Sequence, residues 1–142
     1  MDWKAEITAA EARIRPHVRE TPLERSHHLS QAGGAEVYLK LEHLQHTGSF
    51  KLRGAMNKLL SLVPEQLGLG VIAASTGNHG MAVSYAARKL GAAATIYMKE
   101  GAPREKVELI RSYGGHTEFQ GENPVHAEIK ARAVARQSGQ VF

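Results

Sequence analysis

The alternation of apolar and polar positions predicts strands and helices that follow one another along most of the chain. Three short apolar or alternating runs are predicted strands: Gly70–Ser75, Ala93–Lys99 and His116–Gln120. The runs between and after them place apolar residues at helical spacing and end at glycines, so they are predicted helices: 78–91, 102–115 and 123–139. Strand–helix alternation with short connections predicts an α/β fold with an open parallel sheet and flanking helices.

The first part of the chain is less regular. Thr8 and Glu11 have the spacing of a capping box, which predicts that a helix begins there. The run Glu36–Glu42 alternates in polarity and is a predicted strand. A further helix is predicted to begin at Ser49, because serine is a favoured N-cap. The chain stops at Phe142 within a predicted strand, which indicates a fragment of a longer protein.

Lys51 occupies an unusual position for a lysine. It falls in the first turn of the helix predicted from Ser49, where the helix dipole disfavours a cation. One interpretation is an ordinary solvated lysine. The other is a nucleophilic amine, because the helix terminus, nearby Arg53 and partial burial would all disfavour the ammonium form. A lysine of that kind suits Schiff-base chemistry.

The segment Ala74–Gly80, with the sequence ASTGNHG, joins a predicted buried strand to a predicted helix. Ligands of open α/β sheets bind at the carboxyl ends of strands, and a helix N-terminus favours an anion. Gly77 and Gly80 are expected to let the backbone approach a ligand closely. The segment therefore predicts an anion site, with a plain capped turn as the alternative. Its candidate binding residues are Ser75, Thr76, Gly77, Asn78 and His79.

Composition excludes several other functions. The net charge is +4, but the basic residues are dispersed and aromatic residues make up only 6%, so nucleic acid is not an expected partner. The absence of cysteine excludes disulfides and thiolate chemistry. His43 and His46 have no carboxylate or cysteine nearby, so no metal site is expected. No apolar run is long enough to span a membrane, and a cytoplasmic protein is expected.

Two stretches together carry a resemblance to a known family. LKLEHLQHTGSFKLRGA and IAASTGNHGMAVSYAARKLG closely resemble the fold-type II pyridoxal-phosphate enzymes, in particular threonine/serine dehydratases and serine racemases. The resemblance implies pyridoxal 5'-phosphate as cofactor, with Lys51 as its Schiff-base lysine and as acid/base at the substrate α-carbon. Phe50 would pack on the cofactor ring, and Asn78 would bond the ring hydroxyl. The loop from Ser75 to His79 would hold the substrate carboxylate.

The same resemblance implies a domain organisation and an activity. Residues 49–142 would form the small α/β domain, and residues 1–48 would belong with a larger domain that is mostly absent, together with the phosphate-binding loop. The expected reaction is β-elimination of threonine or serine to a 2-oxo acid and ammonia by a homo-oligomer, with this chain alone inactive.

Several alternatives stay open. In one alternative, the substrate is another β-hydroxy amino acid, as in hydroxyectoine breakdown. In another, the enzyme is a serine racemase, because Thr76 stands where racemases carry a serine. An alternative of another class is a non-catalytic α/β module that only binds a small anion.

Overall fold

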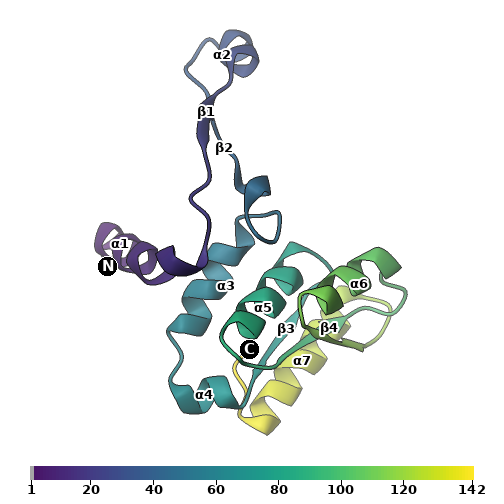
Figure 1. The fold of residues 1–142 in the computed structure, drawn as a ribbon. Coiled ribbons are helices and arrows are strands. Elements are labelled where there is room, and N and C mark those ends of the chain that lie inside the picture. Colours follow the sequence, from purple (N-terminus) through teal and green to yellow (C-terminus); the bar gives the residue numbers. More distant parts are fainter. Residues whose placement is uncertain (1) are drawn as a thin grey trace.

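A three-stranded parallel sheet lies at the centre of the computed structural model, which describes residues 2–142 (Figure 1). Its strands are β3 (Val71–Ala74), β4 (Ala94–Met98) and β5 (His116–Phe119), and an antiparallel pair elsewhere is formed by β1 (Leu23–Arg25) and β2 (Tyr38–Lys40). The helices are α1 (Trp3–Ile14), α2 (His27–Gly33), α3 (Lys51–Leu60), α4 (Pro64–Gly68), α5 (Asn78–Lys89), α6 (Arg104–Ser112) and α7 (Pro124–Ser138), with 3₁₀ turns at Arg15–His17 and Glu42–Leu44.

The strands of this sheet follow their order in the sequence. β4 lies between β3 and β5, and both neighbours run parallel to it, with Val71 opposite Ala94 and Thr95 opposite His116. Val141 adds a single parallel bridge to Val71 on the free side of β3. The predicted α/β fold with an open parallel sheet is therefore confirmed.

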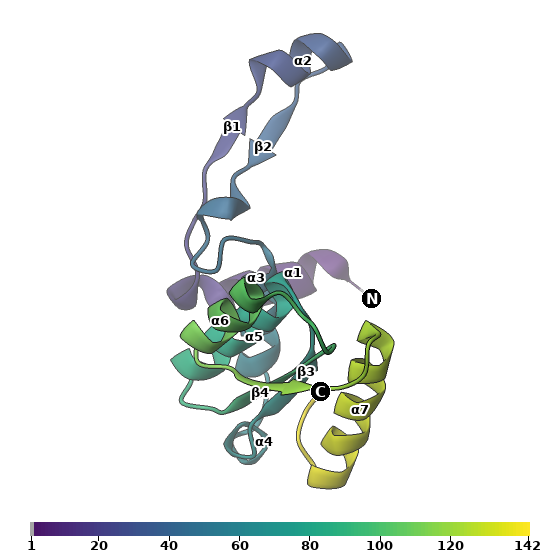
Figure 2. The same ribbon diagram turned by 90° about the vertical axis from the view of Figure 1, so that its right-hand side faces the viewer.

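Helices cover both faces of the sheet (Figure 2). On one face α5 and α6 pack on the strands and α3 packs along α5, and the buried side chains of these helices form the main core with Val71 and Ala73. On the other face α7 packs alone, and its inward stripe consists of Ala127, Ala131 and Ala135. Alternate residues of a strand point to opposite faces, and small alanines let α7 approach the sheet closely. The result is a three-layer arrangement with its strand ends open on the carboxyl edge.

The N-terminal segment divides into two parts with different surroundings. α1 lies against α3, and its last residue, Ile14, is buried in the main core. β1, α2 and β2 instead form an arm that extends away from the sheet and its helices (Figures 1 and 2). Leu23, Tyr38 and Leu39 are exposed on this arm. The arm meets the rest of the chain at its base, just ahead of α3.

Two predicted helix starts are wrong. α1 begins at Trp3 and not near Thr8, because the Asp2 carboxylate accepts hydrogen bonds from the backbone N–H groups of Lys4 and Ala5 at 3.0 and 3.2 Å. α3 begins at Lys51 after Phe50, and Ser49 caps nothing. Phe50 is already helical, with φ −61° and ψ −16°, so the turn has no extended cap residue.

Other boundaries differ in smaller ways. The strand predicted at Glu36–Glu42 is only Tyr38–Lys40, and its partner β1 and the short helix α4 were not predicted. α6 begins at Arg104 after its N-cap Pro103, and α7 begins at Pro124 after its N-cap Asn123, so both begin within the predicted ranges 102–115 and 123–139. Short antiparallel pairs depend on contacts between distant segments, so local pattern defines them poorly.

Gly115 is expected to be essential for packing the start of β5. A Cβ there would lie 2.2 Å from the hydroxyl oxygen of buried Ser84 and 2.9 Å from Cγ2 of buried Ile110. Gly115→Ala should therefore lower the free energy of unfolding by roughly 1–3 kcal/mol, as overpacked cores do. Urea unfolding followed by circular dichroism measures this change.

The control is Gly54→Ala, since a Cβ at Gly54 in α3 meets no atom within 4 Å. This variant should be neutral or more stable, because alanine is the better helix former. Equal stability of the two variants would contradict the packing argument.

Candidate active site at the carboxyl edge of the sheet

The packing of α3 along α5 brings the two sequence motifs together. Lys51 is the first residue of α3, and His79 is the second residue of α5. The pKa of the His79 imidazole is lowered, first by loss of hydration and then by the positive charge of Lys51. His79 is therefore neutral at neutral pH, and it lies within electrostatic reach of the Lys51 amine.

Lys51 presents its amine on an aromatic surface. The Nζ atom lies 4.9 Å from the centroid of the Phe50 ring, and the Phe50 side chain is 58% exposed. Lys51 is itself exposed, so the expected partial burial of this lysine is wrong. The ring of Phe50 thus forms an open apolar surface with the Lys51 amine above it.

Arg53 does not act as a free cation beside Lys51, contrary to expectation. Its guanidinium donates to both carboxylate oxygens of Glu42, at 2.6 and 3.0 Å. This hydrogen bond is the largest influence on Glu42 and lowers the pKa of that carboxyl, although burial opposes the shift. The same bond raises the pKa of Arg53. Thr21 also donates to Glu42, at 2.5 Å. Thr21, Glu42 and Arg53 therefore connect the base of the arm to the first turn of α3, two residues after Lys51.

The loop after β3 provides unpaired backbone donors. Gly77 is the N-cap of α5, and the N–H groups of Asn78, His79 and Gly80 make no hydrogen bond to any described residue. A Cβ on Gly77 would meet nothing within 4 Å, so the space in front of these donors is open. Free N–H groups at the positive end of a twelve-residue helix favour a carboxylate or phosphate.

Gly80 has a different role from the one expected. Its backbone is buried, and a Cβ there would lie 3.0 Å from Ile110, 3.1 Å from Ile96 and 3.2 Å from the Ser75 carbonyl. Glycine at this position therefore allows α5 to pack closely on the sheet, and it does not open space for a ligand. The expectation that Gly80 lets a ligand approach is wrong.

The polar side chains around this loop differ in their hydrogen bonding. The Ser75 hydroxyl accepts from the Gly77 N–H at 3.2 Å, which holds the loop in shape. The Thr76 hydroxyl has no partner among residues 2–142, and Asn78 is exposed. Two buried hydroxyls that the sequence did not single out, Thr47 and Ser49, also have no partner within the described chain. Buried polar groups without partners are costly, so this turn is suited to a polar ligand.

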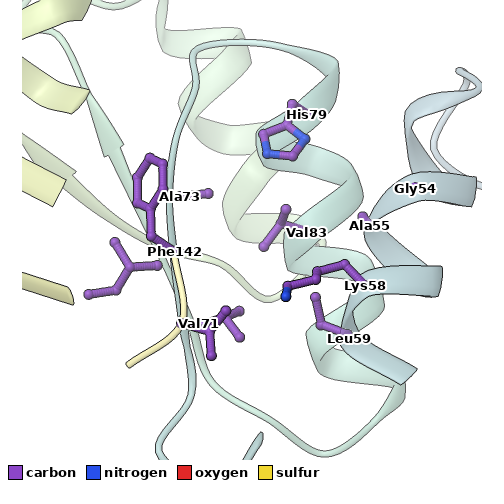
Figure 3. Close-up of a pocket in the computed structure, with 11 residues that line it drawn as sticks. Gly54, Ala55, Lys58, Leu59, Val71, Ala73, His79, Val83 and Phe142 are labelled. Carbon is purple, nitrogen blue, oxygen red and sulfur yellow. The ribbon is translucent and has the colours of Figure 1, made fainter. Parts of the chain in front are cut away.

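A separate apolar cavity of about 200 Å³ lies between α3, β3 and α5 (Figure 3). Ala55, Lys58 and Leu59 of α3 face Val71, and His79 closes one end of the cavity. Neither Lys51 nor the loop Ser75–Gly77 lines it. The lysine and the loop that are predicted to bind the ligands therefore lie outside this cavity.

Comparison with known proteins decides the family. The sequence profile described as "Pyridoxal-phosphate dependent enzyme" matches residues 14–142. This chain belongs to the pyridoxal-phosphate dependent enzymes. It is 47% identical over 133 residues to a putative threonine dehydratase of Sinorhizobium fredii, covering 94% of this chain and 40% of that protein. It is 43% identical over 135 residues to L-threonine dehydratase catabolic TdcB of Staphylococcus aureus, covering 94% of this chain and 39% of the relative.

Solved structures of the family agree with the observed fold. Maize serine racemase superposes with a TM-score of 0.89 at 36% identity, over 96% of this chain and 42% of that one. A processed threonine deaminase of Solanum lycopersicum superposes with a TM-score of 0.87 at 33% identity, over 97% and 39% of the two chains. The predicted fold-type II architecture is thus confirmed. The chain spans about 40% of the length of the curated relatives that it matches.

The residues present suit the family's cofactor. The exposed ring of Phe50 offers an apolar face for a pyridine ring, and the Lys51 amine lies over that face. The unpaired hydroxyls of Thr47 and Ser49 precede Lys51 in the same turn. No group of three or more metal-binding side chains occurs among residues 2–142. Within the same residues, no helix is both long and apolar enough to cross a membrane.

The ion pair behind Lys51 is expected to make stability depend on pH. Because the folded-state pKa of Glu42 is lowered, its stabilisation is present above the ordinary carboxyl pKa and is lost as the pH falls through the folded value. Glu42→Gln should lower the free energy of unfolding by roughly 1–3 kcal/mol at neutral pH, since it weakens the bonds of a half-buried guanidinium. Urea unfolding at about pH 7 and about pH 3 should show the difference shrinking in acid.

Glu24→Gln is the control, because Glu24 is exposed on β1 and forms no ion pair with a described residue. Its stability should follow the wild type at both pH values. A Glu42→Gln deficit that is the same in acid would contradict the role of the ionised carboxylate.

Proposed function

We propose that this chain carries the lysine and the carboxylate-binding loop of an enzyme that eliminates the β-hydroxyl of threonine or serine, giving a 2-oxo acid and ammonia. The observation that carries the proposal is the packing of α3 along α5, with His79 of the first turn of α5 lining the same cavity as Gly54 and Ala55 near the start of α3, just after Lys51 (Figure 3). The reported threonine dehydratase relatives support the same reaction. A module that only binds an anion has no need of an amine at this position.

Each site residue then has a separate task. When bound, pyridoxal phosphate supplies an electron sink for the charge that develops at the substrate α-carbon. Phe50 would support the cofactor ring, and Asn78 would donate from its exposed amide to the ring hydroxyl. Lys51 would hold the cofactor and then take the α-proton on Nζ. Neutral His79 adds no positive charge that would compete with this amine.

The loop from Ser75 to His79 would orient the substrate. Its free backbone N–H groups and the positive end of α5 would bind the α-carboxylate in the open space beside Gly77. Ser75 would hold the loop through its bond with the Gly77 N–H. Fixing the carboxylate leaves the α-hydrogen within reach of one base, which is the positional part of catalysis.

The proposal extends to organisation and location. Residues 49–142 would act as the small domain, and the segment 1–48 would belong with a larger domain. The exposure of Leu23, Tyr38 and Leu39 on the arm supports this division, whereas Ile14 of α1 packs in the core of the small domain. Homo-oligomeric assembly and cytoplasmic location are parts of the same proposal. Light scattering on purified protein tests the assembly.

Lys51 is expected to be the residue modified by the cofactor. Incubation of the chain with pyridoxal phosphate, borohydride reduction and peptide mass mapping should place the pyridoxyl group on Lys51. The reason is that its exposed amine lies over an aromatic face beside the positive end of α5. Lys58→Gln is the matched control, because Lys58 is exposed two turns along the same helix. Modification of Lys58 or of any other lysine in preference to Lys51 would disprove the assignment.

Serine racemisation is a second candidate activity, and Thr76 is the observation that favours it. Its hydroxyl has no partner among residues 2–142 and lies in the loop proposed to hold the substrate. The match to maize serine racemase points the same way. A free hydroxyl there is able to exchange a proton with the α-carbon from the face opposite Lys51.

Thr76→Ala is expected to abolish any D-serine formation and to leave 2-oxo acid release within about threefold of wild type, since Lys51 alone serves elimination. Chiral chromatography of serine after partial turnover measures the first quantity, and a 2-oxo acid assay measures the second. Thr76→Ser should retain the racemisation. Unchanged D-serine formation in Thr76→Ala would remove this candidate.

A further inference from the structure

A second small cavity lies on the opposite face of the sheet from Lys58, under the N-terminus of α7. Its volume is about 130 Å³. Ser75 and Thr76 follow β3 directly, Tyr97 lies in β4 and Lys99 follows that strand. Glu128 comes from α7. These residues line a space that we call the α7 cavity. It is too small for a nucleotide and has room for a group of a few heavy atoms.

Tyr97 is the feature of the α7 cavity that points to a ligand. Its side chain lies on the α7 face among Ile72, Ala127 and Ala131, and the residue is only 9% exposed. Its hydroxyl makes no hydrogen bond to any residue from 2 to 142, and the oxygen is not fully buried. Tyr97 is one of the residues that line the cavity. Burial, the larger cause, and the charge of Glu118 raise the pKa of this phenol, so it stays protonated and available as a donor. A protonated phenol that lines a cavity and is accessible from it can donate to a ligand that enters the cavity.

The charges around the α7 cavity favour an anion. Lys99 is half-buried and forms no ion pair within residues 2–142. α7 is fifteen residues long and directs its positive end at the cavity, although the N–H groups of Val125 and His126 already bond to Asn123. The helix therefore contributes its potential and not free donors. Glu128 and Glu118 are the opposing charges. The Glu128 carboxylate contacts Arg132 at 2.8 Å, and the Glu118 carboxylate contacts His116 at 2.8 Å.

We propose that the α7 cavity binds a small oxyanion, a carboxylate or a phosphate, through the Tyr97 hydroxyl and the Lys99 ammonium. This site is distinct from the loop donors of α5, because none of Asn78, His79 and Gly80 lines the α7 cavity. Both sites share the segment Ser75–Gly77, so an anion under α7 would act on the loop that is proposed to hold the substrate. The α7 cavity would then serve as an effector site.

Titration of the chain with inorganic phosphate, followed in ¹H–¹⁵N spectra without pyridoxal phosphate, tests the inference. The expected result is saturable shifts of the Thr76 and Lys99 amides, absent when sodium chloride is added at the same ionic strength. A parallel titration with acetate shows whether carboxylates occupy the same site. Because no cofactor or substrate is present, this experiment is independent of the proposed reaction.

Matched variants identify the binding groups. Tyr97→Phe and Lys99→Gln should each weaken the dissociation constant for phosphate by at least about tenfold, since each removes a charge-assisted hydrogen bond. Tyr38→Phe and Lys106→Gln, both at exposed positions away from the α7 cavity, should bind as the wild type does. Thermal melts confirm that all four variants fold.

Three results would overturn the proposal. They are the absence of saturable shifts in the wild type, equal affinity in all four variants, and shifts confined to residues outside the α7 cavity.

Discussion

The close contact between α5 and the sheet at Gly80 is the constraint on which the site depends. The missing side chain lets Ile96 and Ile110 approach the helix backbone, so the first turn of α5 is held directly against the strand ends. This contact fixes the direction in which the unpaired N–H groups of Asn78 and His79 point. Because cores are close-packed, an added Cβ at this point would require Ile96, Ile110 or the turn itself to shift by a few tenths of an ångström.

α3 takes its position from the same helix. It packs along α5 and buries Leu52, Met56 and Leu59, while its first residue, Lys51, stays at the open edge. The pair of Arg53 and Glu42 ties this end of α3 to the base of the arm. Apolar packing therefore sets the axis of α3, and a half-buried ion pair holds the end that carries the amine. Breaking this half-buried pair would leave an unpaired charge, and this cost holds the two side chains together.

The carboxyl edge of the sheet thus collects donors on both of its faces. On the α5 side they are backbone N–H groups beside an aromatic platform, and on the α7 side they are the phenol of Tyr97 and the ammonium of Lys99. The segment Ser75–Gly77 connects the two groups of donors: Ser75 and Thr76 line the α7 cavity, and Gly77 is the N-cap of α5. Parallel sheets place strand ends and helix N-termini at one edge, and this shared geometry explains why anion-binding features concentrate there.

The sequence by itself determined the alternation of strands and helices, the position of Lys51 at a helix start and the anion-favouring loop after β3. These features are local: they depend on spacing, glycines and caps within a few residues of each other. Tertiary structure alone decided that Ser49 turns inward, that Arg53 is paired with Glu42 and that Gly80 serves packing. It also decided that Tyr97 packs under α7 and lines the α7 cavity. Each of these depends on a neighbour distant in sequence, and a pattern of polarity along the chain contains no information about which distant side chain fills the space beside it.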